Sequence, residues 1–477
     1  MTEPVTRATQ DDPVLRSASE VIGGPAGDHS RGHPWWTPVR VLLVVAAVCC
    51  ALGMVQKAGC FNSTWQNGDQ RYTQMCYSDL PYLYTGRGFA ELTWPYTDDA
   101  ETRARYETME YPVGISYVAY ATAVLTHLAT GSPELSARAQ QPVGELWNDP
   151  EVVTEIRTFV SLSAILFALM AIVSTYLLAQ VNPRRPWDAL GFAASPALLL
   201  TGLVNWDLLA VVLVAGALWA WARGRPVLTG VLIGLGVATK LYPLFLLGGL
   251  LVICLRQRRL TDLVRVTVAA ALSWILVNAP AYVTGPEQWK VFWHFNSERT
   301  ADLGSIWLVL SQLPAPDHAF SAHTINVASW LFFSVWCLGV LLVGLRAPVT
   351  PRFAQLGFVI VAGFLLVNKV YSPQYVLWLL PLAVLARPRW RDLLIWQAGE
   401  VFYFASVWWY LGGELDSSTA DGGAPVYWIA IVLRIAAQLY LVAVVVRDML
   451  RPWHDPVDRD EPEDYSETST RSKSVAV

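Results

Sequence analysis

Long apolar runs separated by short polar segments make up the chain between residues 38 and 450. Most approach the length, about 20 residues, at which a helix crosses a bilayer. The first run covers 39–55. Further runs are predicted near 156–180, 189–204, 208–222, 227–238, 244–255, 263–283, 327–345, 353–367, 375–386, 393–411 and 426–446. Several are short for a full crossing, which predicts thin or broken helices inside a bundle.

Arginines gather at every second boundary of these runs and assign the two sides of the membrane, because cations are enriched in cytoplasmic loops. Arg31 and Arg40 favour a cytoplasmic N-terminus. The later clusters are Arg184 and Arg185, Arg223 and Arg225, Arg256, Arg258 and Arg259, Arg346 and Arg352, Arg387, Arg389 and Arg391, and Arg447 and Arg451. Outer loops are therefore expected at 58–155, 205–207, 239–243, 284–326, 368–374 and 412–425.

The number of membrane crossings before Arg184 is inconsistent with the sides that the arginines assign. We expect an odd number of crossings before Arg184, but only two apolar runs there are clear. The segment 113–128 is apolar enough to enter the membrane, yet Gly114, Ser116 and His127 interrupt it. The total is therefore predicted as about 12 or 13, with the later loops on the outer side as given above.

Composition agrees with an all-α polytopic membrane protein. Of the 477 residues, 54% are hydrophobic and 15% charged, against about 25% charged in soluble domains. The 22 Trp and 19 Tyr suit anchors at headgroup level. Residues 1–36 and 451–477 are polar and are predicted as disordered cytoplasmic tails, which leaves 37–450 as the membrane domain. A net charge of -4 gives no indication of nucleic-acid binding.

The six cysteines show no metal-binding spacing. Four lie in apolar runs, where cysteine usually behaves as a small hydrophobic residue. Cys60 and Cys76 lie in the polar segment after the first run, so they are a candidate disulfide if that segment is extracytoplasmic. The sequence leaves this pairing open, because disulfide geometry depends on the fold. No metal is expected, since the outer acids are not clustered at ligand spacing.

Polar residues at the predicted outer boundaries are candidates for binding. Cations there oppose the usual bias and should have an anionic partner, either an internal acid or a phosphate. The alternatives are cations that reach out to headgroups and an acid that caps a helix. The residues are Asp207, Lys240, Arg299, Lys369 and Gln374. Glu400 and Arg434 lie inside apparent spans and could pair with each other, in a structural role.

Asp79 stands among aromatic residues in the stretch 76–84. It is either an acid of a surface loop or a general base that takes a proton from an attacking hydroxyl. In the second case, nearby cations would stabilise a departing phosphate, and the aromatic rings would suit a sugar face. The chain has neither a P-loop nor a GxGxxG opening a helix, so a nucleotide-bound donor is not expected.

Five short segments occur in an order that resembles the actinobacterial members of glycosyltransferase family 87, also called the DUF2029 group. The resemblance spans about 38–450 and implies a GT-C fold with about 12–13 transmembrane helices. It also implies juxtamembrane helices in the long first outer loop, which would account for 113–128. The segments are Ser78-Asp79, Tyr111-Pro112-Val113-Gly114, Asn205-Trp206-Asp207-Leu208, Ala238-Thr239-Lys240-Leu241-Tyr242-Pro243 and Asn368-Lys369-Val370-Tyr371-Ser372-Pro373-Gln374-Tyr375.

The resemblance implies inverting transfer of a sugar, most often mannose, from a polyprenyl phosphate to a lipid-linked or glycan acceptor. This transfer serves cell-envelope biosynthesis at the outer face of the plasma membrane, without a cofactor. Asp79 matches the acid that acts as catalytic base. The residues that would bind donor phosphate and sugar are Lys240, Arg299, Lys369, Gln374, Tyr371 and Asp207. The alternatives are arabinofuranosyl transfer, and a transporter or lipid-linked sugar flippase, for which repeat symmetry would argue; no internal repeat is visible.

Overall fold

The computed structural model describes residues 35–313, 320–415 and 424–457, and the regular elements in these ranges are all helices. This confirms the predicted all-α polytopic fold. Five of the helices are long and apolar enough to cross a membrane by length and composition: α3 (Pro38–Gln56), α10 (Pro150–Ala179), α16 (Leu260–Thr284), α19 (Ala322–Arg346) and α23 (Pro425–Leu450).

Shorter helices occupy most of the remaining predicted runs. Two of them, α20 (Phe353–Val367) and α21 (Val376–Ala386), are buried along nearly their whole length. Their position inside the bundle accounts for runs that are apolar but short. The others are α13 (Asp207–Ala222), α14 (Pro226–Val237) and α15 (Leu246–Arg256). The run near 393–411 forms α22 (Trp390–Leu411), which has 22 residues but is not among the five candidate spans.

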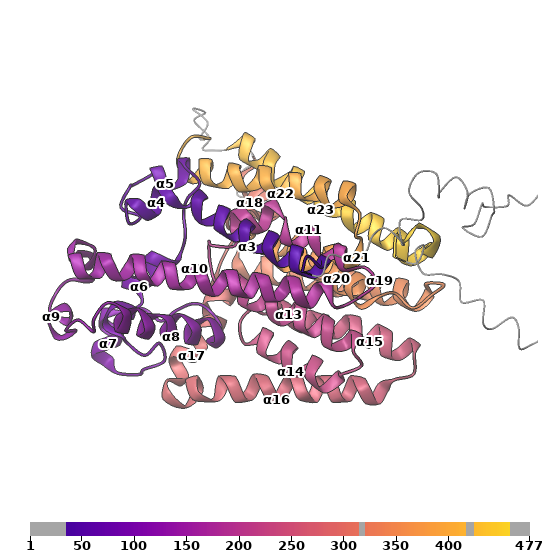
Figure 1. Ribbon diagram of the computed structural model, residues 1–477, viewed down its shortest axis with the longest axis horizontal. Helices are drawn as coiled ribbons and strands as arrows, with labels where there is room; N and C mark the ends of the chain where they lie inside the picture. Colours follow the sequence, from indigo (N-terminus) through magenta and orange to yellow (C-terminus); the bar gives the residue numbers. More distant parts are fainter. Residues whose placement is uncertain (1–34, 314–319, 416–423, 458–477) are drawn as a thin grey trace, which may run out of the picture.

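The long helices lie roughly along one axis and define two ends of the molecule (Figure 1). At the end where α3 begins and α23 finishes, arginines tie neighbouring helices together. Arg256 donates to the carbonyl of Gly344 at 2.9 Å, and Arg352 forms an ion pair with Asp455. We call this the arginine end. The opposite end, where α4 to α9 gather in Figure 1, is called the site end.

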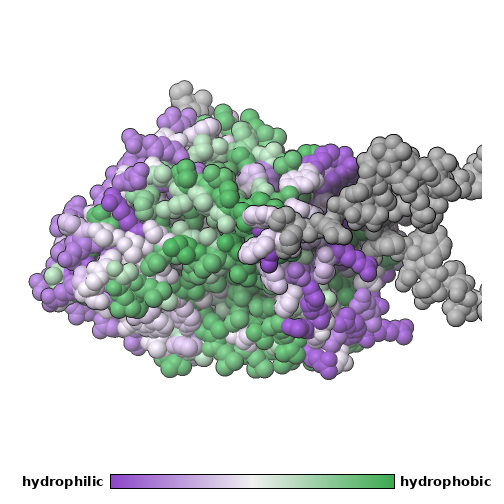
Figure 2. Space-filling view, in the orientation of Figure 1, coloured by the Kyte–Doolittle hydropathy of each residue, from purple (hydrophilic) through white to green (hydrophobic). Residues whose placement is uncertain are grey.

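A belt of hydrophobic residues crosses the middle of the surface in Figure 2, with hydrophilic residues at both ends. Exposed apolar side chains in the described part of the chain include Leu276 (73%), Leu331 (65%) and Val264 (60%). Soluble monomers rarely expose contiguous apolar surface on this scale. The belt therefore suits contact with lipid chains.

The first outer segment explains the conflict over the number of crossings. Its short helices are α4 (Ala58–Asn62), α5 (Gln70–Thr73), α6 (Leu80–Gly86), α7 (Ala100–Arg105), α8 (Val113–Ala129) and α9 (Ser136–Ala139). In Figure 1 these helices stay at the site end, where α8 packs against α10. The expected odd count was wrong, because two crossings, α3 and α10, already return the chain to the side on which it began.

The predicted run at 189–204 is wrong as a single helix. The chain forms η3 (Pro186–Ala189), α11 (Leu190–Ala193) and α12 (Pro196–Thr201) in its place. Pro196 has no backbone N–H and disfavours a helical residue before it. Ser195 is accordingly extended, and its hydroxyl caps α12 by accepting from the Leu198 N–H at 3.3 Å.

The predicted C-terminal tail also begins later than residue 451. Asp455 is only 2% exposed, and it accepts hydrogen bonds from Arg352 and, at 2.8 Å, from Gln355. Residues 451–457 therefore belong to the packed body. Residues 1–34 and 458–477 of the two predicted tails lie outside the described residues.

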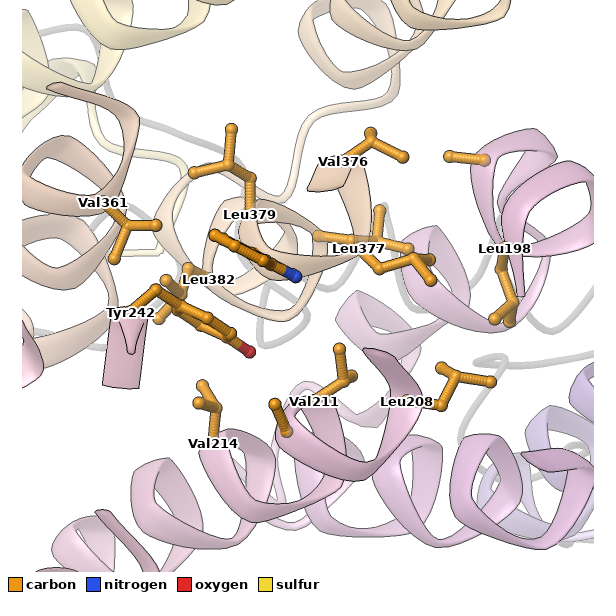
Figure 3. Packing of buried hydrophobic residues seen from close by; sticks show 14 of the residues in the cluster. Leu198, Leu208, Val211, Val214, Tyr242, Val361, Val376, Leu377, Leu379 and Leu382 are labelled. Carbon is orange, nitrogen blue, oxygen red and sulfur yellow. The ribbon is translucent and has the colours of Figure 1, made fainter. Parts of the chain in front are cut away.

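Close packing in the bundle depends on small residues and buried rings. A Cβ at Gly230 or Gly234 of α14 would stand 2.2 or 2.1 Å from a carbonyl oxygen of α16. This GxxxG spacing lets the two backbones approach, as in other membrane helix pairs. Figure 3 shows Tyr242 among Val214 of α13 and Leu382 of α21, with its ring stacked 4.7 Å from that of Trp378.

Candidate functional site

A cavity of about 620 Å³ lies at the site end, and residues from distant segments line it. The structure brings together five residues predicted from sequence: Asp79, Lys240, Arg299, Lys369 and Gln374. The lining also includes aromatic side chains of α17 (Pro286–Glu298) and α19. Residues of motifs that lie up to about 300 residues apart in the chain therefore line one polar and aromatic cavity.

The backbone of Asp79 is anchored by neighbouring carbonyls, and its carboxylate lies on the cavity wall. The Asp79 N–H donates to the carbonyl of Val204 at 2.9 Å, and the Ser78 hydroxyl donates to that of Leu203 at 2.8 Å. Asp79 precedes α6, yet its side chain makes no capping hydrogen bond. Its Oδ2 instead accepts from the Asn205 amide at 2.7 Å and the Tyr111 hydroxyl at 3.4 Å. The residue is therefore not a simple helix cap.

The surroundings of Asp79 make it a weaker acid than usual. Desolvation raises the pKa of its carboxyl to about 6. The hydrogen bonds from Tyr77 and Asn205 and the positive charge of Lys240 lower the pKa, whereas the charge of Asp207 raises it. A carboxylate with a pKa near 6 is ionised at neutral pH and accepts a proton more readily than an ordinary aspartate.

If Asp79 acts as a general base, the loss of activity at low pH (the acid limb) should depend on Asn205, which donates to its carboxylate. We expect the rate to fall as pH drops through about 6, since a protonated Asp79 cannot act as base. Asn205→Ala removes a hydrogen bond to the ionised form, so the pKa should rise and the limb should move upward by about one pH unit. The pH dependence of kcat/KM measures it. Asn148→Ala, at an exposed position, is the control, and an unmoved limb in Asn205→Ala would contradict the assignment.

Lys240 and Asp207 form an ion pair next to Asp79. The Lys240 Nζ lies 3.3 Å from Asp207 Oδ1, and their side chains are 8% and 0% exposed. The same carboxylate oxygen accepts from the Trp378 indole at 2.7 Å. Lys240 lines the cavity, with its ammonium 4.8 Å from the centre of the Tyr111 ring. Asp207 lies behind it and does not line the cavity, so it holds the lysine in place.

A close backbone contact connects these two parts of the site. The Gly114 N–H donates to the carbonyl of Ala238 at 2.7 Å. A Cβ at Gly114 would stand 2.7 Å from the Thr239 methyl group and 2.8 Å from the Ala238 oxygen. Only glycine fits this approach. It keeps the segment that carries Tyr111 against the segment that carries Lys240.

Lys369 is a cation of the cavity wall that forms no ion pair with the described residues. Its ammonium donates to neutral oxygens, the carbonyl of Arg299 at 2.9 Å and the amide of Asn326 at 2.6 Å. Desolvation and the nearby charge of Arg299 lower its pKa. Arg299 is itself paired with Asp302. An anion in the cavity would relieve the unfavourable position of the Lys369 charge.

Gln374 presents an unused acceptor to the same space. Its side chain is 5% exposed and lines the cavity, and its Oε1 has no hydrogen-bond partner in the described structure. A buried amide oxygen normally finds a donor. A ligand hydroxyl would satisfy it.

Tyr371 lies apart from the cavity. Its hydroxyl donates to Glu400 at 2.9 Å, and the Arg434 guanidinium lies 3.6 Å from its ring centre. Glu400 and Arg434, which could pair directly, form no direct ion pair in the described structure, because Tyr371 lies between them and contacts both. The structure therefore places Tyr371 in a buried structural cluster, which argues against contact with a donor.

Two residues given no role from sequence complete the Asp79 environment. Asn205 and Tyr111 hydrogen-bond each other at 2.7 Å as well as Asp79. Both lie within short motifs that the sequence shows, but their convergence depends on packing across 94 residues. Within the described residues, no group of three or more His, Cys, Asp or Glu is placed to hold a metal ion.

Comparison with known proteins agrees with the sequence resemblance. Residues 150–368 match the family model of glycosyltransferase family 87, while no curated protein matches the chain. The matched segment contains Asp207, Lys240 and Arg299, whereas Asp79 and Gln374 lie outside it. Several apolar helices accompany the match. The match identifies residues 150–368 as a segment of glycosyltransferase family 87 and, with the apolar helices, supports a membrane glycosyltransferase.

Proposed function

We propose that the protein transfers mannose from a polyprenyl-phosphate donor to a hydroxyl of a lipid-linked or glycan acceptor, with inversion. The observation that carries this proposal is the joint presence of Asp79, Lys240 and Lys369 on the wall of one cavity. A carboxylate suits the acceptor hydroxyl, and a cation without an ion pair suits a phosphate.

In this reaction, the Asp79 carboxylate accepts the proton of the acceptor hydroxyl while the hydroxyl oxygen bonds to the anomeric carbon. The bond from that carbon to the phosphate oxygen breaks, and polyprenyl phosphate leaves with the electron pair. Lys240 and Lys369, with Arg299 at the rim, stabilise the charge that grows on the phosphate. A single displacement inverts the anomeric configuration.

The apolar part of the cavity suits a lipid donor. Phe333 and Phe364 line it, and Trp330 continues the wall outward with its side chain 51% exposed. Trp330 lies on α19, whose other exposed side chains include Leu331. A polyprenyl chain would enter along this face while its phosphate reaches the lysines.

The charge pattern supports an extracytoplasmic site in the plasma membrane. The arginine end is the cytoplasmic one by the positive-inside rule, so the cavity faces the opposite side. Cys60 and Cys76 form a disulfide near the site end, as the sequence allowed, and disulfides persist in oxidising compartments.

The test is transfer from radiolabelled polyprenyl-phosphate mannose by membranes of a strain that overproduces the protein. We expect a labelled lipid or glycan product that is absent with Asp79→Asn membranes. Polyprenyl-phosphate arabinose in a parallel reaction distinguishes arabinofuranosyl transfer. Lack of transfer from either donor, together with movement of the intact donor across vesicles, would favour the transporter or flippase alternative.

A further inference from the structure

Lys57 is a buried cation that the proposed reaction leaves unexplained. It follows α3 directly and is 1% exposed, so its ammonium reaches neither water nor headgroups. Its Nζ donates to the backbone carbonyls of Tyr77 at 2.9 Å and Met75 at 3.4 Å, and it forms no ion pair with the described carboxylates. Lys57 does not line the cavity, so it cannot contact a substrate there.

A lysine in this environment needs a specific reason, because burying an ammonium without a carboxylate contact is unfavourable. Desolvation lowers the pKa of Lys57 to about 7, and the negative charge of Asp79 opposes this. The Tyr77 carbonyl that its ammonium binds lies two residues before Asp79. The buried cation therefore lies in the electrostatic field of the candidate base.

Neutral side chains also hold the turn at residues 75–77, just before Asp79. Gln56 donates to the Met75 carbonyl at 2.7 Å, and the Trp65 indole donates to that of Cys76 at 3.3 Å. The Cys60–Cys76 disulfide adds a covalent tie, and Met75 has a φ of +55° that non-glycine residues rarely adopt. These neutral donors anchor the carbonyls of residues 75 and 76, whereas Lys57 binds that of Tyr77 and also adds a positive charge.

We propose that Lys57 is a positioning residue for Asp79: its ammonium holds the carbonyls of residues 75 and 77, and its charge favours the ionised carboxylate. The inference rests on the proposed function, since it requires Asp79 to act as base. The other charged or titratable groups around Asp79 are Tyr77, Glu110, Tyr111, Lys240 and Asp207. Lys57 and Lys240 are both buried, but Lys240 lines the cavity and Lys57 does not.

The experiment compares Lys57→Met, Lys57→Gln and Lys57→Arg in the purified full-length enzyme with a polyprenyl-phosphate sugar. For Lys57→Met we expect kcat to fall about 10- to 100-fold, with the donor KM changed less than about twofold. The acid limb should move upward by about one pH unit, because loss of a positive charge raises the pKa of Asp79. Lys57→Arg, which keeps the positive charge, should show the same acid limb as the unmodified enzyme. Lys57→Gln, which keeps a hydrogen-bond donor but no charge, should show the shifted limb.

The control is Lys290→Met, which removes an exposed lysine paired with Glu287 at 2.7 Å and should leave all three quantities unchanged. Size-exclusion and melting profiles show whether each variant is folded. If Lys57→Met does not fold, the pH profile of Lys57→Gln tests the proposal. An unchanged acid limb in folded Lys57→Gln would overturn the proposal, because Lys57 would then serve only to pack the turn. Full activity of Asp79→Asn would instead overturn the proposed function, so the two failures are distinguishable.

Discussion

Asp79→Asn is expected to reduce sugar transfer by about 10²- to 10⁴-fold, the usual range for loss of a general base. Asparagine keeps the size of the side chain, and its carbonyl oxygen still accepts from Asn205, whose amide lies 2.7 Å from Asp79 Oδ2. The backbone bond from residue 79 to Val204 does not involve the side chain. We therefore expect normal insertion and folding with loss of kcat, measured by single-turnover transfer from the labelled donor.

A matched control for this substitution is Asp69→Asn. Asp69 is an exposed acid in the same outer segment, and its side chain makes no capping hydrogen bond. Its replacement should leave transfer unchanged. If Asp79→Asn transferred sugar at the normal rate while donor binding was intact, another group would have to be the base.

Lys240→Met is expected to lower both stability and activity. It would leave the Asp207 carboxylate buried at 0% exposure with only the Trp378 indole as a partner. Its Oδ2 already has no hydrogen-bond partner among the described residues. Breaking a buried ion pair on one side typically costs about 3–5 kcal/mol. The melting temperature in detergent should fall, and transfer should fall with it.

The double variant Lys240→Met with Asp207→Asn separates the two effects. A neutral asparagine removes the uncompensated charge and retains an oxygen for Trp378, so most of the lost stability should return. Transfer should remain low, because the cation that faces the cavity is still missing. Recovery of transfer in the double variant would show that Lys240 serves only to neutralise Asp207.

Much of the membrane architecture was predictable because a bilayer imposes a simple rule on composition. The runs at 39–55, 208–222 and 353–367 match α3, α13 and α20 within one residue at each end. The failures occurred where local backbone chemistry overrides composition. The run at 189–204 is apolar but broken at Pro196, and α8 is apolar but packs at the site end against α10.

The candidate site was only partly predictable from residue type and position. A cation at an outer boundary signals an anionic partner, and this reasoning selected Lys240 and Lys369. It could not tell that Lys240 already has Asp207 whereas Lys369 has only neutral oxygens. It also could not exclude Tyr371 from the predicted donor-binding residues. Gln374 of the same motif lines the cavity, whereas the Tyr371 hydroxyl donates to Glu400.

The sequence by itself determined that this is a helical membrane protein with arginine clusters at every second boundary of its apolar runs, because hydropathy and charge act on each segment separately. It also singled out Asp79 and the family motifs. The tertiary structure alone decided which motifs meet: Asn205 reaches Asp79 across 126 residues, and Lys57 reaches the carbonyl of Tyr77 from the end of α3. Such contacts depend on how helices pack and which backbone groups remain unpaired, and neither property belongs to a single segment.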